Sequence, residues 1–148
     1  MKAINYLALA TIFLSYPAFA AATSEPHQLD LDYEACMTPT PDYAGMMACV
    51  ETYSQKWEDE LNRVYEKFRQ RLDDKTRPTL ENAQNAWLAH RKAEVELYPA
   101  IKAGQPVDDF IFAEKKMRLI ADRAKELKNL SDYVFLAEEE KKAQQGKI

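Results

Sequence analysis

The chain has 148 residues and carries 20 Lys and Arg against 24 Asp and Glu, so its formal net charge at pH 7 is −4. This mildly acidic balance argues against nucleic acid or an anionic membrane as the main partner, because both attract cationic proteins. The length suits one domain that buries one hydrophobic core.

Residues 1–20 have the features of an export signal. Lys2 supplies a positive charge, an apolar stretch follows over residues 7–16, and Ala18-Phe19-Ala20 fits a cleavage site of small residues. The stretch is short for a transmembrane helix and is soon followed by polar residues. We therefore expect export, a processed chain that begins near Ala21, and no stable membrane insertion after cleavage.

A polar leader follows over residues 21–35, and we expect it to be loose unless Cys36 ties it down. Cys36 and Cys49 are the only cysteines. An even pair in an oxidising compartment predicts a disulfide, which would stabilise the domain by roughly 3 kcal/mol. The alternative is a reactive or metal-binding thiol pair, although the spacing is not a usual zinc or redox spacing and the chain has only two histidines, His27 and His90.

The first long helix is predicted over residues 41–72. Thr40 is expected to be its N-cap and Pro41 its first helical residue. Its apolar residues recur every three or four positions, which is the spacing of a helix and not of a strand. They are Met46, Val50, Tyr53, Trp57, Leu61, Val64, Phe68 and Leu72.

The second helix is predicted to start at Pro78, after a connection over residues 73–77, and to end or kink at Pro99. Its apolar face is expected to comprise Leu80, Ala83, Trp87, Val95, Tyr98 and Ile101. Breaker residues at 103–106 separate it from the third helix, which should be capped by Asp108 or Asp109.

The third helix is predicted to bury Phe110, Ala113, Met117, Ile120, Ala121, Ala124, Leu127 and Leu130. Ser131-Asp132 is a candidate interruption, with residues 133–136 as a further turn or short helix. Residues 137–148 are expected to be a polar, charged and frayed tail. With no alternating strand pattern and only three glycines, the chain is predicted to be all-α. We expect a small antiparallel bundle of three to four helices over residues 36–136, with one N-terminal disulfide.

Polar residues fall on or beside the predicted apolar faces. Arg91 continues the stripe of the second helix, Gln84 lies beside that stripe, and Asn62 follows Leu61 in the first helix. One interpretation is a buried network of Asn62, Gln84 and Arg91 that holds the helices in register; another is that Arg91 reaches the surface and binds a partner.

Trp57 and Trp87 are in phase with the apolar stripes. We therefore expect core packing for both, rather than platforms that stack on a sugar.

Catalytic patterns are not found in the sequence. Neither histidine is placed for a Ser-His-Asp triad, and acidic clusters such as residues 58–60 resemble solvated surface. The sequence has no glycine-rich phosphate loop and no metal-ligand spacing. We therefore expect neither enzymatic activity nor a cofactor or bound metal.

One block of residues resembles the LprI-type lysozyme inhibitor family. The resemblance spans residues 36–130 and implies a helical bundle, disulfides, export to the bacterial periplasm or cell surface, and a protein partner such as a basic lysozyme. The residues that carry it are expected to be mainly structural, and they leave the partner-binding residues unknown. They are Cys49, Tyr53, Leu61, Asn62, Tyr65, Ala83, Gln84, Ala86, Trp87, Arg91, Leu119, Arg123 and Leu127.

The chain departs from this family in two places. Members often carry a second cysteine pair, but here the corresponding positions hold Val95 and about Lys115. The loss of that disulfide should cost a few kcal/mol, which packing around Val95 and Tyr98 would offset. The loop with Gly104 and Pro106 also differs from the glycine-rich loop usual in the family.

Two functions follow from this resemblance and from export. The first is inhibition of a lysozyme, in which the acidic surface would speed encounter with a basic enzyme and a turn would fill its substrate cleft. Residues 73–77 and 103–109 are both candidates for that turn. The alternative is an envelope binding module with a non-lysozyme partner, such as an immunity or assembly protein.

Overall fold

A computed structural model describes residues 25–39 and 41–145. This part of the chain contains four helices and no strand, which confirms the all-α prediction. The expected export signal at residues 1–20 and the expected cap Thr40 lie outside the described residues. The helices are α1 Gln28–Met37, α2 Tyr43–Arg71, α3 Arg77–Ala100 and α4 Asp108–Gln145.

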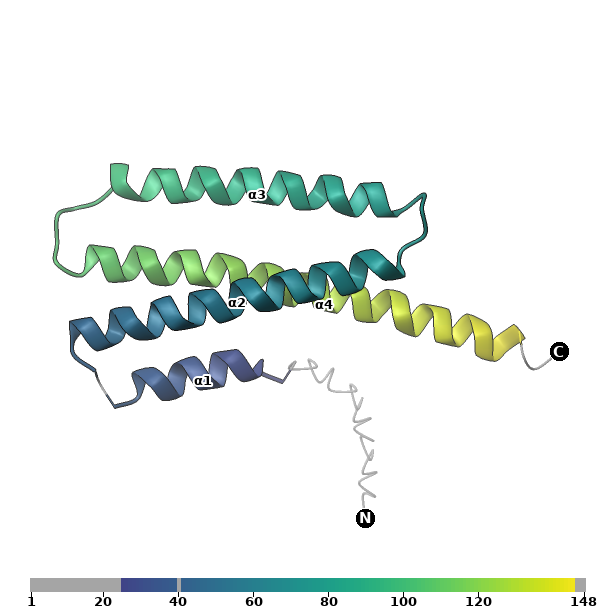
Figure 1. Cartoon of the computed structure of the whole chain (residues 1–148), viewed down its shortest axis with the longest axis horizontal. Helices are drawn as coiled ribbons and strands as arrows, with labels where there is room; N and C mark the ends of the chain where they lie inside the picture. The colour runs from purple at the N-terminus through teal and green to yellow at the C-terminus, as the bar shows by residue number, and fades with distance from the viewer. Residues whose placement is uncertain (1–24, 40, 146–148) are drawn as a thin grey trace, which may run out of the picture.

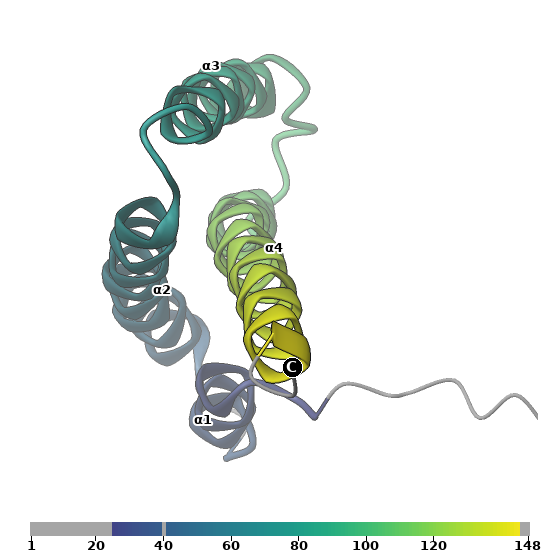
Figure 2. The same ribbon diagram turned by 90° about the vertical axis from the view of Figure 1, so that its right-hand side faces the viewer.

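Each helix runs antiparallel to the next one along the chain (Figure 1). The end-on view shows α2 and α4 side by side, with α1 against one edge of this pair and α3 across the other (Figure 2). The C-terminal end of α4 projects past the other helices. None of the described helices combines the length and the hydropathy that a bilayer crossing requires.

The core is the seam between α2 and α4. Trp57 is only 1% exposed and Leu127 is fully buried, and the small side chains of Ala121 and Ala124 are buried beside them. Small residues let two helices approach closely, so the neighbouring large side chains can interdigitate. The predicted stripe of α2 is confirmed from Val50 to Phe68, and Trp57 is a core residue as expected.

The start of α2 differs from the prediction. Asp42, and not Thr40, is the N-cap, because its Oδ1 accepts a hydrogen bond of 2.9 Å from the backbone N–H of Gly45. Pro41 therefore precedes the helix. Gly45 is needed there, since a Cβ at this position would lie 2.6 Å from Pro41 Cβ. The predicted end near Leu72 is confirmed, with Arg71 as the last helical residue.

The leader is tied down and helical from Gln28 onward. Cys36 and Cys49 form a disulfide with Cα atoms 6.0 Å apart, which confirms the predicted pair. Buried Tyr33 packs edge-on against Tyr53 with ring centroids 5.7 Å apart, and its hydroxyl donates to Glu114 of α4. Burial, together with the Glu114 carboxylate, raises the pKa of Tyr33 to about 12. The sequence did not predict this helix because ten residues are too few for a clear period.

The register of α3 also differs from the prediction. Ala83 and Ile101 are exposed, whereas Gln84 is buried. The inward face therefore passes from Leu80 through Gln84, Trp87 and Arg91 to Val95 and Tyr98, with Leu80 and Tyr98 buried at its two ends. The helix ends one residue after Pro99, as predicted.

The last helix is longer than expected. Ser131-Asp132 does not interrupt it: Ser131 is buried on the inward face, Asp132 pairs with Lys128, and Leu130 is 46% exposed instead of buried. The tail beyond residue 137 continues as helix to Gln145, because Glu, Lys, Ala and Gln are strong helix formers that need no packing partner to be compatible with a helix.

Removal of the disulfide tests how α1 is held. The double variant Cys36→Ser/Cys49→Ser should lose about 3 kcal/mol of unfolding free energy, since the loop between the cysteines would no longer be closed in the unfolded chain. Urea denaturation measures this loss. Hydrogen exchange should show the greatest loss of protection in α1, because this helix also loses its covalent link to α2. Unchanged stability of the wild type after reduction would contradict the expectation.

Candidate functional site

A groove lies between α2, α3 and α4, with a volume of about 760 Å³. Val50 and Ile120 contribute apolar surface to it, while Glu51, Glu58 and Arg91 contribute charge. A smaller pocket of about 320 Å³ adjoins it, because Met47, Ala113 and Lys116 line both. The smaller pocket lies next to the turn between α3 and α4, which contributes Lys102.

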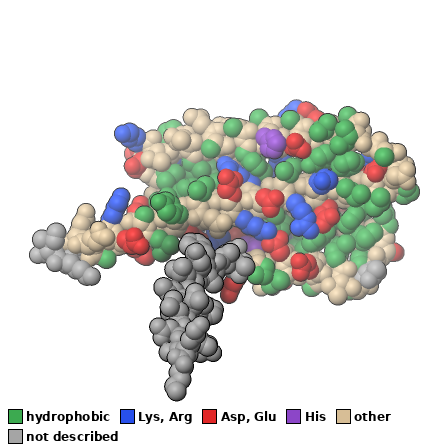
Figure 3. Space-filling view, turned by 180° about the vertical axis from the view of Figure 1, so that it is seen from behind, with side chains coloured by type: hydrophobic (Ala, Val, Ile, Leu, Met, Phe, Trp, Pro, Cys, Tyr) green, Lys and Arg blue, Asp and Glu red, His purple; other side chains and the backbone are tan. Residues whose placement is uncertain are grey.

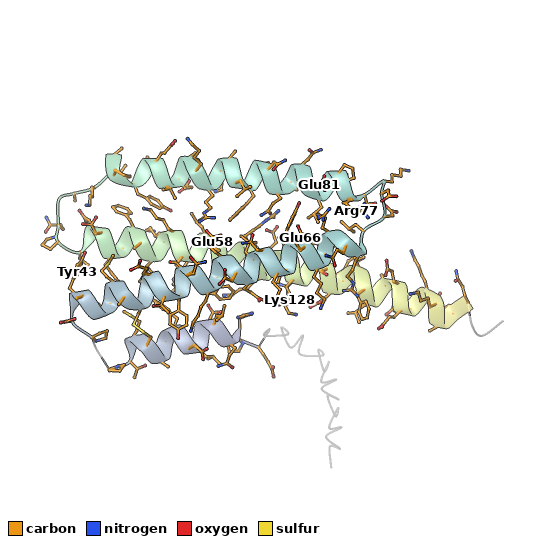
Figure 4. All side chains as sticks on the ribbon, viewed as in Figure 1. Tyr43, Glu58, Glu66, Arg77, Glu81 and Lys128 are labelled. Atoms are coloured by element: carbon orange, nitrogen blue, oxygen red, sulfur yellow. A yellow bond between two sulfur atoms is a disulfide. The ribbon has the colours of Figure 1, made fainter. Side chains whose placement is uncertain are left out.

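An ion pair connects α2 to α3 across the groove. Arg91 donates from its guanidinium to the carboxylate of Glu58, and both side chains are about three-quarters buried. Figure 4 shows Glu58 on the side of α2 that faces α3. Arg91 also lies over the Trp87 ring, 5.6 Å from its centroid. Arg91 therefore lies on the inward stripe as predicted, but it is engaged within the bundle.

The expected network of Asn62, Gln84 and Arg91 is wrong. Asn62 is exposed. Gln84 Oε1 instead accepts a hydrogen bond of 3.0 Å from Arg123 Nε of α4, and both side chains are buried. Arg123 Nη1 donates a further hydrogen bond of 2.8 Å to Glu126 Oε2. The sequence placed Arg123 in the family-like block, but only the tertiary structure reveals its partner, which lies on another helix.

Most of the remaining residues of the family-like block mark packing, whereas Ala83 and Ala86 are exposed. Tyr53 and Leu61 are buried, and Tyr65 and Trp87 pack partly buried against the core. They come from two helices and do not converge on one cavity.

Acidic residues 58–60 are not uniformly solvated surface, as the sequence suggested. Glu60 accepts two hydrogen bonds from Arg63, and Glu60 Oε1 lies 3.5 Å from His27 Nε2. The pKa of Glu60 is lowered from its ordinary value, chiefly by the hydrogen bond from Arg63. His27 Nδ1 accepts from the Leu29 N–H and so caps α1, and its ring lies 4.6 Å from the Trp57 ring. His27 thus anchors α1 to α2.

The turn between α3 and α4, residues 101–107, is exposed along its whole length. Gly104 has a φ of 80°, a left-handed conformation that favours glycine, and a Cβ there would meet open space. At the base of the turn, Lys102 pairs with Asp109 and Asp108 accepts a 2.8 Å hydrogen bond from the Gln105 N–H.

Apolar side chains gather at this end of the bundle (Figure 3). Ile101, Val107 and Ile111 are all more than a third exposed, as is Tyr43, which Figure 4 places at the same end. Beneath them Tyr98 stacks on Phe112 with centroids 5.0 Å apart. This stack joins α3 to α4 in the region where packing was expected to offset the missing second disulfide.

The opposite turn, residues 72–76 between α2 and α3, is short and internally bonded. Asp73 accepts a 2.7 Å hydrogen bond from the Thr76 N–H, and bonding to Thr76 lowers the pKa of Asp73. Arg77 clamps the turn by donating to the Leu72 carbonyl at 2.9 Å and to Asp74 at 2.6 Å. Figure 4 shows Arg77 beside the end of α2.

In the described ranges, 25–39 and 41–145, no three His, Cys, Asp or Glu side chains are grouped in a way that could hold a metal ion. Both cysteines are in the disulfide, so the alternative of a reactive or metal-binding thiol pair does not hold.

Comparison with known proteins gives one match. The family model described as "Lysozyme inhibitor LprI" matches residues 34–127, which is more than half of the chain. The matched region begins in α1 and ends in α4, so it includes the disulfide, the groove and both turns. Neither a curated protein nor a solved structure matches the chain.

The bond between Gln84 and Arg123 makes a testable contribution to stability. Gln84→Leu should lower the unfolding free energy by about 1–3 kcal/mol, because the Arg123 Nε would be left buried without an acceptor. Arg123→Met should be destabilising for the matching reason, and the double variant should lose less than the sum of the two singles. Urea denaturation of the wild type and the three variants completes this cycle.

Asn62→Leu is the matched control, and it should change stability by less than about 0.5 kcal/mol because Asn62 is exposed. A loss for Asn62→Leu as large as that for Gln84→Leu would instead support the network that the sequence suggested.

Glu60 should make the free energy of unfolding depend on pH. Its pKa is lowered in the folded state, so its stabilising contribution is present above the unfolded-state pKa and disappears as the pH falls through the folded-state pKa. Urea midpoints measured from pH 6 down to pH 3 should therefore fall less steeply for Glu60→Gln than for wild type. Asp59→Asn, at the exposed neighbouring position, should retain the wild-type slope; equal slopes for all three proteins would refute the assignment.

Proposed function

The chain belongs to the LprI lysozyme inhibitor family, and from this membership we propose that it acts by binding a lysozyme rather than by catalysis. The family match over residues 34–127 is the observation that carries the proposal. We also propose that residues 1–20 direct the protein to the periplasm or the exterior of a bacterium, where a lysozyme would reach its cell-wall substrate.

Two features of the molecule support this proposal. A disulfide between Cys36 and Cys49 suits an oxidising compartment. The charge distribution suits a basic partner, since the chain has no Lys or Arg between Glu25 and Gln55. Exposed Glu34 and Glu51 belong to this acidic segment, which spans α1 and the first half of α2. Such a charge would raise the association rate more than the final affinity.

A panel of lysozymes tests the proposal. The processed chain, at micromolar concentration, should inhibit cell-wall hydrolysis by at least one basic lysozyme. Its association rate should fall as salt is added, because screening weakens the attraction between the acidic segment and the enzyme. A reduced and alkylated sample provides the control for dependence on the folded, oxidised protein.

Full activity of every lysozyme in that panel would contradict the proposal. Capture from a periplasmic extract, with one stoichiometric partner that is not a lysozyme, would then favour the alternative of an envelope binding module.

A further inference from the structure

The smaller pocket between α2, α3 and α4 is lined mainly by apolar side chains. Its volume is about 320 Å³, within the range of roughly 300–1,000 Å³ that is usual for small-molecule sites. Tyr98 and Phe112, which stack on each other, both line it. Burial, and then the nearby Glu94, raises the pKa of Tyr98, so its hydroxyl stays neutral. The other apolar residues of the lining are Met47, Pro99 and Ala113.

Three charged side chains also line this pocket, and two of them neutralise each other. Lys102 is paired with Asp109. The third is Lys116, which lines both this pocket and the larger groove. In the part of the chain that the structure describes, the Lys116 ammonium makes neither an ion pair nor a hydrogen bond. The lining of the pocket therefore carries one unmatched positive charge.

The position of Lys116 on α4 explains why it has no partner on its own helix. Side chains three and four residues away are the neighbours that can pair with a helical lysine. Around Lys116 all four of them are apolar: Phe112, Ala113, Leu119 and Ile120. Lys116 is also partly buried. An anion bound beside it would therefore be attracted more strongly than by a lysine in full contact with water.

The neighbouring carboxylates do not cancel this charge within the pocket. Glu58 is paired with Arg91 in the groove, and Asp108 accepts a hydrogen bond from the backbone of the turn that precedes α4. Glu51 lines the groove but is exposed, so water and salt screen its charge. Like Glu94, these three carboxylates are not part of the lining of the smaller pocket.

We propose that the smaller pocket binds a small molecule with an apolar body and one carboxylate, and that the Lys116 ammonium holds this carboxylate. The ammonium has three N–H donors, and hydrogen bonds between charged groups are stronger than those between neutral groups. The apolar body lies against Met47, Tyr98 and Phe112. A longer body has room to extend into the groove, because Met47, Ala113 and Lys116 line both spaces. This inference goes beyond the proposed function and does not depend on it.

Titration with octanoate tests the inference on the oxidised, processed chain with no lysozyme present. Isothermal titration calorimetry, below the concentration at which octanoate forms micelles, should show saturable binding of one molecule per protein. The ε-methyl NMR signal of Met47 should shift during the titration, and that of Met37 in α1 should not. Octan-1-ol has the same chain without the charge, so it should bind about tenfold more weakly or worse.

Substitution of Lys116 separates the ammonium from the apolar lining. Lys116→Gln should raise the Kd for octanoate by about tenfold or more, as expected for loss of a hydrogen bond between charged groups, and should change the Kd for octan-1-ol by less than about twofold. The matched control is Lys115→Gln, because Lys115 is the adjacent residue, is exposed and lines neither space. It should change the Kd for octanoate by less than about twofold. Circular dichroism and the unfolding midpoint establish that each variant is folded.

A parallel titration with 2-naphthoate distinguishes the two kinds of apolar body. Tighter binding of octanoate would identify the ligand as an alkyl carboxylate, and tighter binding of 2-naphthoate would identify it as an aromatic one. No saturable binding of either carboxylate by the wild type would overturn the inference. Equal affinity of the wild type for octanoate and octan-1-ol, or equal weakening in Lys116→Gln and Lys115→Gln, would also overturn it. The proposed function is tested separately, by inhibition of lysozymes, and would stand in each of these cases.

Discussion

The packing of α2 on α4 is the constraint on which the rest of the structure depends. Trp57 and Leu61 of α2 are buried with Ala121, Ala124 and Leu127 of α4, and these two helices supply most of the core. Burial of a Trp or Leu side chain is worth a few kcal/mol, so this seam makes a large contribution to the stability of a small domain. The positions of α1 and α3 follow from this seam, because each packs along one of its edges.

The two outer helices are attached by different interactions. A disulfide, the Tyr33–Tyr53 contact and the His27 cap hold α1 against the seam. Leu80 and Tyr98 are buried near the two ends of α3. In its middle, Trp87 packs partly buried against the core, and polar pairs join α3 to Glu58 and Arg123. Polar pairs specify register more than they add stability. This mode of attachment leaves a groove open between α3 and the seam, and it places an exposed turn at each end of α3.

The residues that carry the family resemblance are mainly structural. The residues that carry the family resemblance are largely buried or paired inside the bundle, as with Tyr53, Trp87 and Arg123. They account for the fold because their side chains fill the core or connect its helices. A match to the family therefore indicates the scaffold directly.

The sequence by itself determined whatever depends on local periodicity and chemistry. It predicted the disulfide, the ends of α2 and α3 to within a few residues, and the buried stripes of the two central helices, because apolar spacing and breaker residues act over one or two helical turns. Only the tertiary structure decided features that depend on a partner elsewhere in the chain. Helix α1 is ordered by contacts with α2 and α4, Gln84 finds Arg123 across a helix interface, and Asn62 turns to solvent. These contacts join residues far apart in the chain, so no local pattern in the sequence could predict them.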